Sequence, residues 1–145
     1  MEKAANNYKG FTLIEILVVV ALIAILAAIT IIAINPAKHF SEARDAQRSS
    51  DVVQILNAVT QYTSEQDNTL ADLGTIPVCT GTPAAIGTGG VDLGATLVDE
   101  YIVGIPTDPD GGTAADTGYT ICQTAGGRVQ VDAPGAENSV ISVSR

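Results

Sequence analysis

Hydrophobic residues are unevenly spread along the chain, and their densest run predicts a membrane-spanning helix. From Phe11 to Ile34, 21 of 24 residues are hydrophobic, and the exceptions are Thr12, Glu15 and Thr30. A helix of this length rises about 36 Å at 1.5 Å per residue, which is enough to cross a hydrocarbon core of about 30 Å. Because the run is apolar on all sides, lipid or a protein core must surround it. We therefore predict a single transmembrane helix over residues 11–35.

A second helix is predicted over residues 37–67. Hydrophobic residues recur there at offsets 0, 3, 4, 7 and 10, which is one stripe of a helix, at Val52, Ile55, Leu56, Val59 and Tyr62. Pro36 lacks a backbone donor and disfavours helix at Asn35, so the chain should break or kink between the two helices. The stretch before the stripe is polar almost all round and predicts a solvated stalk. In this stretch Arg44 and Arg48 lie on the same helical face. We expect them to be an exposed pair or to form a salt bridge between subunits.

The C-terminal part predicts a small sheet. Residues 68–118 are rich in Gly, Thr, Pro and Asp and indicate loops. Three segments after them alternate apolar and polar residues, as half-buried strands do: Tyr119–Gln123, Arg128–Asp132 and Val140–Ser144. Their apolar positions should face the second helix; these are Tyr119, Ile121, Val129, Val131, Ile141 and Val143. The predicted fold class is α+β, with a long N-terminal helix packed on a small antiparallel sheet of about three strands (119–144). The predicted soluble head comprises residues 36–145.

Charge and composition exclude several functions. Residues 51–145 hold two arginines against twelve aspartates and glutamates, a net charge of −10, which argues against general nucleic-acid binding. The single histidine, His39, would have to serve any Ser-His-Asp or Cys-His arrangement. We assign no catalytic residues and predict that the chain is not an enzyme.

Glu15 is the informative exception in the apolar run. An ionisable residue inside a membrane span is costly and indicates a function with a charged partner. A plain membrane anchor has no use for Glu15, and the apolar core is too long for an ordinary secretory signal peptide. If the chain were cut between Gly10 and Phe11, a new α-amine would stand four residues before Glu15. The amine of a neighbouring subunit could then pair with Glu15 and fix the axial offset between subunits.

The segment from Lys9 to Glu15, KGFTLIE, and the apolar run after it resemble the class III signal of type IV pilins and type II secretion pseudopilins. The resemblance implies that a prepilin peptidase removes the leader 1–10, that Phe11 is N-methylated, and that the subunits polymerise through their apolar helices. Implied partners are further copies of the chain, an inner-membrane assembly platform and minor pilins. The precursor should cross the inner membrane once, and the filament should lie in the periplasm or outside the cell. One departure is that the first proline, Pro36, follows the run, whereas many family members have one within it.

Two further features of the head predict chemistry. Cys79 and Cys122 are the only cysteines, and in an exported domain a disulfide is favoured over two free buried thiols. Three aspartates, Asp108, Asp110 and Asp116, lie in a Gly-rich loop whose oxygen ligands suit calcium. Residues 105–109, IPTDP, resemble a loop of the major pseudopilins, which bind calcium in a comparable position. The EF-hand spacing is not met, so a solvated acidic turn is the alternative, and no cofactor is predicted to be required.

The sequence thus predicts a structural subunit of a type IV pilus or pseudopilus filament. One alternative is the major pseudopilin of a type II secretion system. A second, from another class of protein, is a membrane-anchored, calcium-dependent binding module that never polymerises. An exported enzyme is a third hypothesis, which no constellation of catalytic residues supports.

Overall fold

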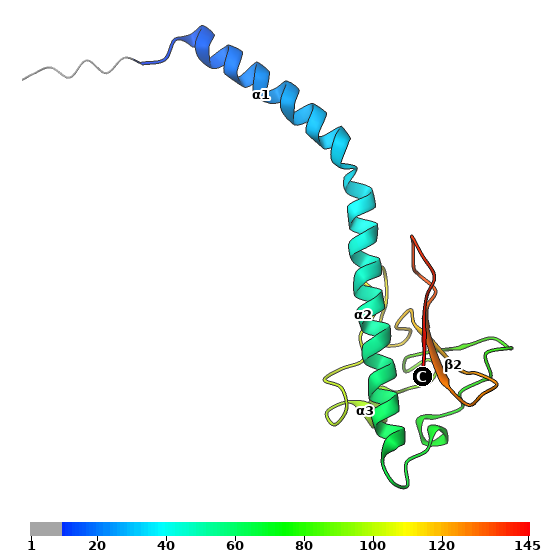
Figure 1. The fold of residues 1–145 in the computed structure, drawn as a ribbon. Helices are drawn as coiled ribbons and strands as arrows, with labels where there is room; N and C mark the ends of the chain where they lie inside the picture. The colour runs from blue at the N-terminus through cyan, green and yellow to red at the C-terminus, as the bar shows by residue number, and fades with distance from the viewer. Residues whose placement is uncertain (1–9) are drawn as a thin grey trace, which may run out of the picture. The chain divides into compact units, whose positions relative to one another are not determined.

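The computed structural model describes residues 10–145 (Figure 1). The chain divides into two compact units, one up to Lys38 and one from His39 to Arg145. The first contains the apolar helix and the second, which we call the head, contains the sheet. This is the α+β class that the sequence predicts, and it is consistent with a pilin-like fold.

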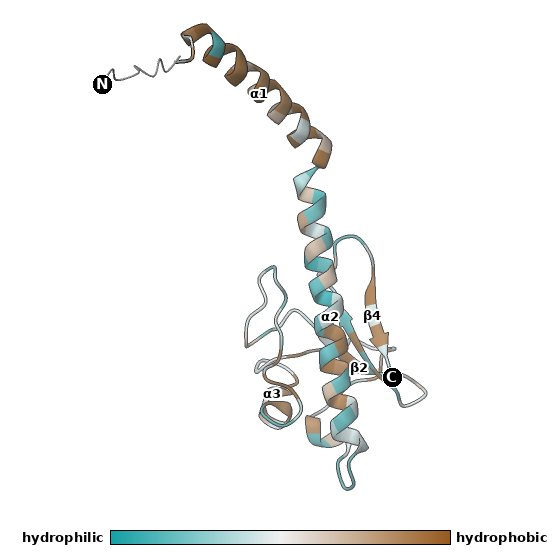
Figure 2. Cartoon of the chain, turned by 60° about the vertical axis from the view of Figure 1, so that its left-hand side comes forward, coloured by the Kyte–Doolittle hydropathy of each residue, from teal (hydrophilic) through white to brown (hydrophobic). Residues whose placement is uncertain are grey.

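Helix α1 spans Leu13–Ile34 and is apolar on every side (Figure 2). None of its residues is buried within the part of the chain that the structure describes, and it is long and apolar enough to cross a membrane. The helix ends at Asn35, whose φ of 46° and ψ of 72° place it in the left-handed region. Pro36 then begins helix α2, so the predicted break lies where the sequence puts it.

Helix α2 spans Pro36–Ser64, three residues short of the end predicted at 67. The predicted apolar stripe is confirmed, because each of its five residues is buried in the core of the head. The polar stretch before the stripe differs from the expected solvated stalk, since Asp45, Arg48 and Asp51 are also buried. The helix therefore packs against the head from about Asp45 onward.

The sheet has four antiparallel strands in the order β1-β2-β3-β4, whereas the sequence predicts about three. The strands are β1 (Ala84–Ala85), β2 (Thr120–Gln123), β3 (Val129–Ala133) and β4 (Ile141–Ser144). Strand β1 was missed because two residues are too few to show an alternation. The segment predicted as loops, 68–118, also contains a 3-10 turn, η1 (Leu70–Leu73), and a short helix, α3 (Gly94–Leu97).

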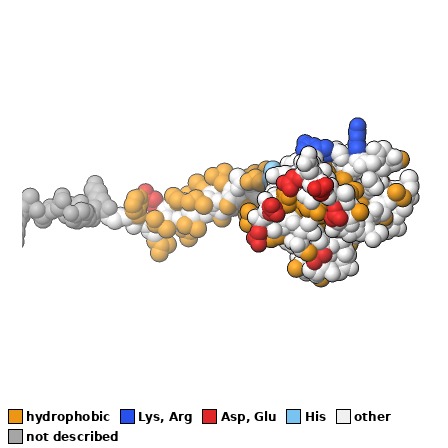
Figure 3. Space-filling view, turned by 90° about the horizontal axis from the view of Figure 1, so that it is seen from below, with side chains coloured by type: hydrophobic (Ala, Val, Ile, Leu, Met, Phe, Trp, Pro, Cys, Tyr) orange, Lys and Arg blue, Asp and Glu red, His pale blue; other side chains and the backbone are white. Residues whose placement is uncertain are grey.

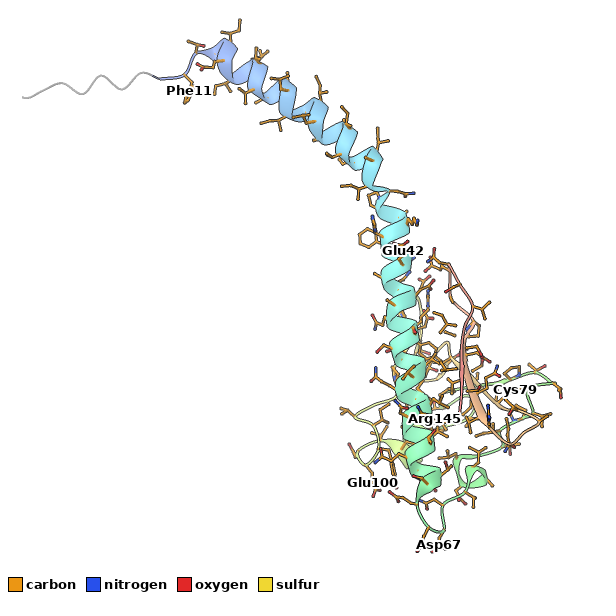
Figure 4. All side chains as sticks on the ribbon, in the orientation of Figure 1. Phe11, Glu42, Asp67, Cys79, Glu100 and Arg145 are labelled. Atoms are coloured by element: carbon orange, nitrogen blue, oxygen red, sulfur yellow. A yellow bond between two sulfur atoms is a disulfide. The ribbon has the colours of Figure 1, made fainter. Side chains whose placement is uncertain are left out.

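The core of the head lies between α2 and one face of the sheet. Tyr119, Ile121 and Val131 are fully buried there, as the alternation predicts, and Ile141 and Val143 pack against it. Cys79 and Cys122 form a disulfide with their Cα atoms 5.0 Å apart, which confirms the predicted pairing (Figure 4). The disulfide ties the long irregular segment before β2 to that strand.

Candidate functional site

The bond between Gly10 and Phe11 lies two residues before Leu13, the first helical residue of α1. Phe11 is 76% exposed, and a side chain at Gly10 would meet no atom within 4 Å. Both residues beside this bond are therefore exposed in the described part of the chain. Residues 1–9, the rest of the predicted leader, lie outside the described residues.

Glu15 forms a capping box with Thr12 at the start of α1. The backbone N–H of Glu15 donates to Thr12 Oγ1 at 3.3 Å, and the backbone N–H of Thr12 donates to Glu15 Oε2 at 3.4 Å. Such a pair satisfies two of the amides that a helix N-terminus leaves without partners. The Thr-x-x-Glu spacing that signals this local role is present at residues 12–15.

In the head, the side chain of Arg48 is only 1% exposed and donates four hydrogen bonds to carboxylates. Its Nε donates to Asp108 Oδ2 at 2.7 Å, and its Nη2 donates to Asp108 Oδ1 at 2.9 Å. Its Nη1 donates to Asp45 Oδ1 at 2.9 Å and to Glu137 Oε1 at 3.1 Å. The expectation of an exposed pair or an intersubunit salt bridge is therefore wrong for Arg48, which connects α2 to two loops of its own head.

Asp45 and Arg44 extend this network. Asp45 accepts the backbone N–H groups of Glu137 and Asn138, and these bonds hold its pKa well below the ordinary value despite burial. Arg44 forms two hydrogen bonds with Glu137, at 2.6 and 2.7 Å, and lowers the pKa of that carboxyl. These hydrogen bonds attach the loop 134–139 to the first half of α2.

The sequence contained a signal for this network. Arg48 stands four residues before Val52, and Asp45 stands three residues before Arg48. Both therefore continue the helical stripe whose later members are hydrophobic. A charged residue on a core-facing stripe must find a partner when it is buried, and acidic residues in the Gly-rich loops supply it.

The three aspartates predicted to bind calcium line a single hollow of about 270 Å³ together with Arg48. Both oxygens of Asp108 accept from Arg48, which keeps the pKa of Asp108 low. A Cβ at Gly118 or Gly135 would lie within 3 Å of Asp108, so these glycines allow the close packing around it. Over residues 10–145, no three side chains of the metal-binding types converge as a metal ion requires. The calcium site stays a prediction.

His39, the histidine on which any catalytic triad would depend, lies on the exposed start of α2. Its Nδ1 is 3.4 Å from Glu42 Oε2, and both side chains are largely exposed. The structure places it in no enclosed site among the described residues, and we assign it no chemistry.

Comparison with known proteins supports the N-terminal motif. Residues 5–34 match the family model described as the prokaryotic N-terminal methylation motif. This confirms the class III prepilin signal that the sequence predicts, and it is consistent with the type IV pilins and pseudopilins. The motif indicates a structural subunit and membrane anchoring of the precursor. No curated protein and no solved structure matched the chain.

Proposed function

We propose that the chain is the structural subunit of a helical filament, a type IV pilus or a related pseudopilus. A prepilin peptidase cuts after Gly10, Phe11 is N-methylated, and the mature subunits polymerise through their apolar helices. The observation that carries this proposal is that α1 is apolar all round, has no buried residue among residues 10–145, and is interrupted near its start by Glu15. Figure 3 shows this concentration of hydrophobic side chains along α1.

The physical basis is an exchange of apolar surroundings. Before assembly, lipid covers α1, and in the filament the α1 helices of other copies cover it. Glu15 lies one helical turn after Phe11, whose new amine is positive at neutral pH. Pairing of that amine with Glu15 of a neighbouring copy satisfies both charges in a dry bundle, and it fixes the axial offset between copies more than it adds stability.

The exposed face of α2 supports the close approach of neighbouring copies. The head has four arginines and fourteen acidic residues, a net charge of −10, so contact between heads brings like charges together. The exposed positions of α2 between Ala46 and Ser64 are nevertheless all uncharged: Ala46, Gln47, Ser49, Ser50, Val53, Gln54, Asn57, Gln61 and Ser64. Another copy can approach these positions without meeting an acidic side chain, so this repulsion is weaker there.

Intact mass and N-terminal analysis of the protein from its native cells test the proposal. The expected product begins at Phe11 and has one added methyl group. A protein that still begins at Met1, or one cut after the apolar run, would overturn the proposal. The same preparation should contain filaments visible by electron microscopy.

The alternatives differ in their system or in their class. The subunits of a type IV pilus and of a secretion pseudopilus assemble by the same interactions. The disulfide favours the pilus, and the predicted calcium loop favours the pseudopilus. In either case an inner-membrane assembly platform and minor pilins are the partners we propose. The finished filament lies in the periplasm or outside the cell. A calcium-dependent binding module that remains a membrane anchor should tolerate Glu15→Val, whereas a filament subunit should not.

A further inference from the structure

Two of the four arginines of the head form ion pairs with carboxylates of the head itself. Arg48 is buried among carboxylates, and Arg44 is bound to Glu137. Arg128 and Arg145 are exposed, and within residues 39–145 no carboxylate forms an ion pair with either. Arg145 Nη1 donates to the neutral Asn57 side chain at 2.9 Å. These two arginines are therefore the head's outward-facing guanidinium groups.

Both arginines lie at the same end of the sheet. Val129 and Arg145 exchange their two backbone hydrogen bonds, at 2.9 and 3.0 Å, and Arg128 precedes Val129. Gln123 pairs with Val129 on one side and bridges to Val78 on the other. Val78 is 55% exposed. We call Val78, Arg128 and Arg145 the basic edge.

Acidic residues gather where α2 ends. The Tyr101 hydroxyl donates to Glu65 Oε2 at 2.6 Å, and the rings of Tyr62 and Tyr101 meet edge to face at 5.5 Å. These contacts bring the loop after α3 beside the end of α2. The pKa of Tyr101 rises to about 12 because of the Glu65 bond, its burial and the nearby Glu100.

This region also presents an exposed apolar side chain. Val103 is 97% exposed, in the same loop as Tyr101. We call this surface the acidic end; it comprises Glu65, Asp67, Asp99, Glu100 and Val103. Figure 4 labels Asp67 and Glu100 at the end of the head where α2 terminates.

We propose that the acidic end of one copy docks on the basic edge of the next copy. The inference rests on the proposed function and adds the contact between heads. The two surfaces have opposite charge, and each presents an exposed valine, Val103 on one and Val78 on the other. Two acidic ends repel each other, so a symmetric pairing of like surfaces is disfavoured. When two different surfaces of the same chain bind each other, each copy can bind the next one in the same way. If the rotation between copies does not close a ring, the result is a helical filament.

Charge exchange in the full-length chain tests this contact. Arg128→Glu and Glu100→Lys should each reduce the yield of filaments several-fold, and the double variant should restore it. Arg128→Lys is the matched control, because it keeps the charge and should keep the yield. Loss of filaments in the single variants without rescue in the double variant would overturn the proposal.

Cross-linking provides a second, independent measurement. A side chain at Gly126 would meet no atom within 4 Å, and this residue lies in the turn beside Arg128. A chain with both Val103→Cys and Gly126→Cys should give a ladder of covalent multimers when its filaments are oxidised, whereas either substitution alone should give none. Filaments without a ladder would overturn the contact and leave the filament function standing. If the wild-type chain forms no filaments in its native cells, the proposed function itself fails.

Discussion

Arg48 and Asp108 form a buried ion pair with two parallel hydrogen bonds, of 2.7 and 2.9 Å, between residues 60 positions apart. The planar guanidinium matches the two carboxylate oxygens, which makes such a pair both strong and directional. It joins α2 to the loop before β2, and Asp45 and Glu137 join the same guanidinium to the loop before β4. Arg48 therefore bonds to both loops, and Arg44 and Asp45 hold the loop before β4 as well.

Loss of the Arg48 side chain should strongly destabilise the head. Arg48→Gln leaves Asp108 buried without its counter-ion, and breaking a buried pair in this way costs about 3–5 kcal/mol. Thermal unfolding of the detergent-solubilised chain, followed by circular dichroism, measures the effect. Arg128→Gln removes the same charge from an exposed position and should change the melting temperature little. Equal melting temperatures for wild type and Arg48→Gln would refute the structural role.

The same network predicts how stability depends on pH. The pKa values of Asp45, Asp108 and Glu137 are all lowered in the folded head, by hydrogen bonds to Arg48, to Arg44 or to backbone amides. A carboxyl with a lowered folded pKa stabilises the protein above its unfolded pKa of about 4, and this stability is lost as the pH falls further. The melting temperature should thus be nearly constant from pH 7 to about pH 5 and should fall below about pH 4. In Asp45→Asn the fall should be shallower; a flat profile down to pH 2 would contradict the prediction.

The Cys79–Cys122 disulfide should stabilise the head substantially. It closes a loop with a sequence separation of 43 residues, which in the chain-entropy model is worth about 4 kcal/mol. Replacing both cysteines by serine should lower the melting temperature, and a reducing agent should have the same effect on the wild type alone. If reduction leaves the wild type as stable as before, the disulfide does not constrain the unfolded chain as this model assumes.

Variants at Glu15 can separate its charge from its capping role. Glu15→Gln keeps an acceptor for the Thr12 amide, as a capping box permits, but it removes the charge that would pair with the Phe11 amine. We therefore expect Glu15→Gln and Glu15→Val both to assemble far more slowly than wild type. Thr12→Ala, which removes the cap and keeps the charge, should assemble nearly normally. The readout is filament yield per cell; normal assembly of Glu15→Gln together with failure of Thr12→Ala would assign Glu15 to capping alone.

Calcium binding by the head is also testable. Asp108 has both oxygens on Arg48, so a calcium ion in this hollow depends chiefly on Asp110 and Asp116. Calcium should raise the melting temperature of the wild type, magnesium should not, and the variant with Asp110→Asn and Asp116→Asn should respond to neither. An unchanged melting temperature in millimolar calcium, with no metal found by elemental analysis, would identify the loop as a solvated acidic turn.

The prepilin signal, the apolar helix and the core-facing positions could all be predicted from the sequence because each depends on local order. Lys9 to Glu15 are contiguous, and the break at Pro36 follows from its missing donor. The stripe of α2 and the alternation in β2, β3 and β4 are periodicities of single elements. Of the residues predicted to face the core, the α2 stripe, Tyr119, Ile121, Val129 and Val131 are buried, and Ile141 and Val143 of β4 are partly buried.

Only the tertiary structure decided which charges from distant parts of the head are paired. Arg48 meets Asp108 and Glu137 across 60 and 89 residues of sequence, and neither loop has a periodicity that could reveal this. Strand β1 exists only because β2 offers it backbone partners. The basic edge and the acidic end likewise arise from chain segments that lie far apart in the sequence. Local patterns determine elements and their buried faces, whereas pairing between distant charges depends on how the loops return to the helix.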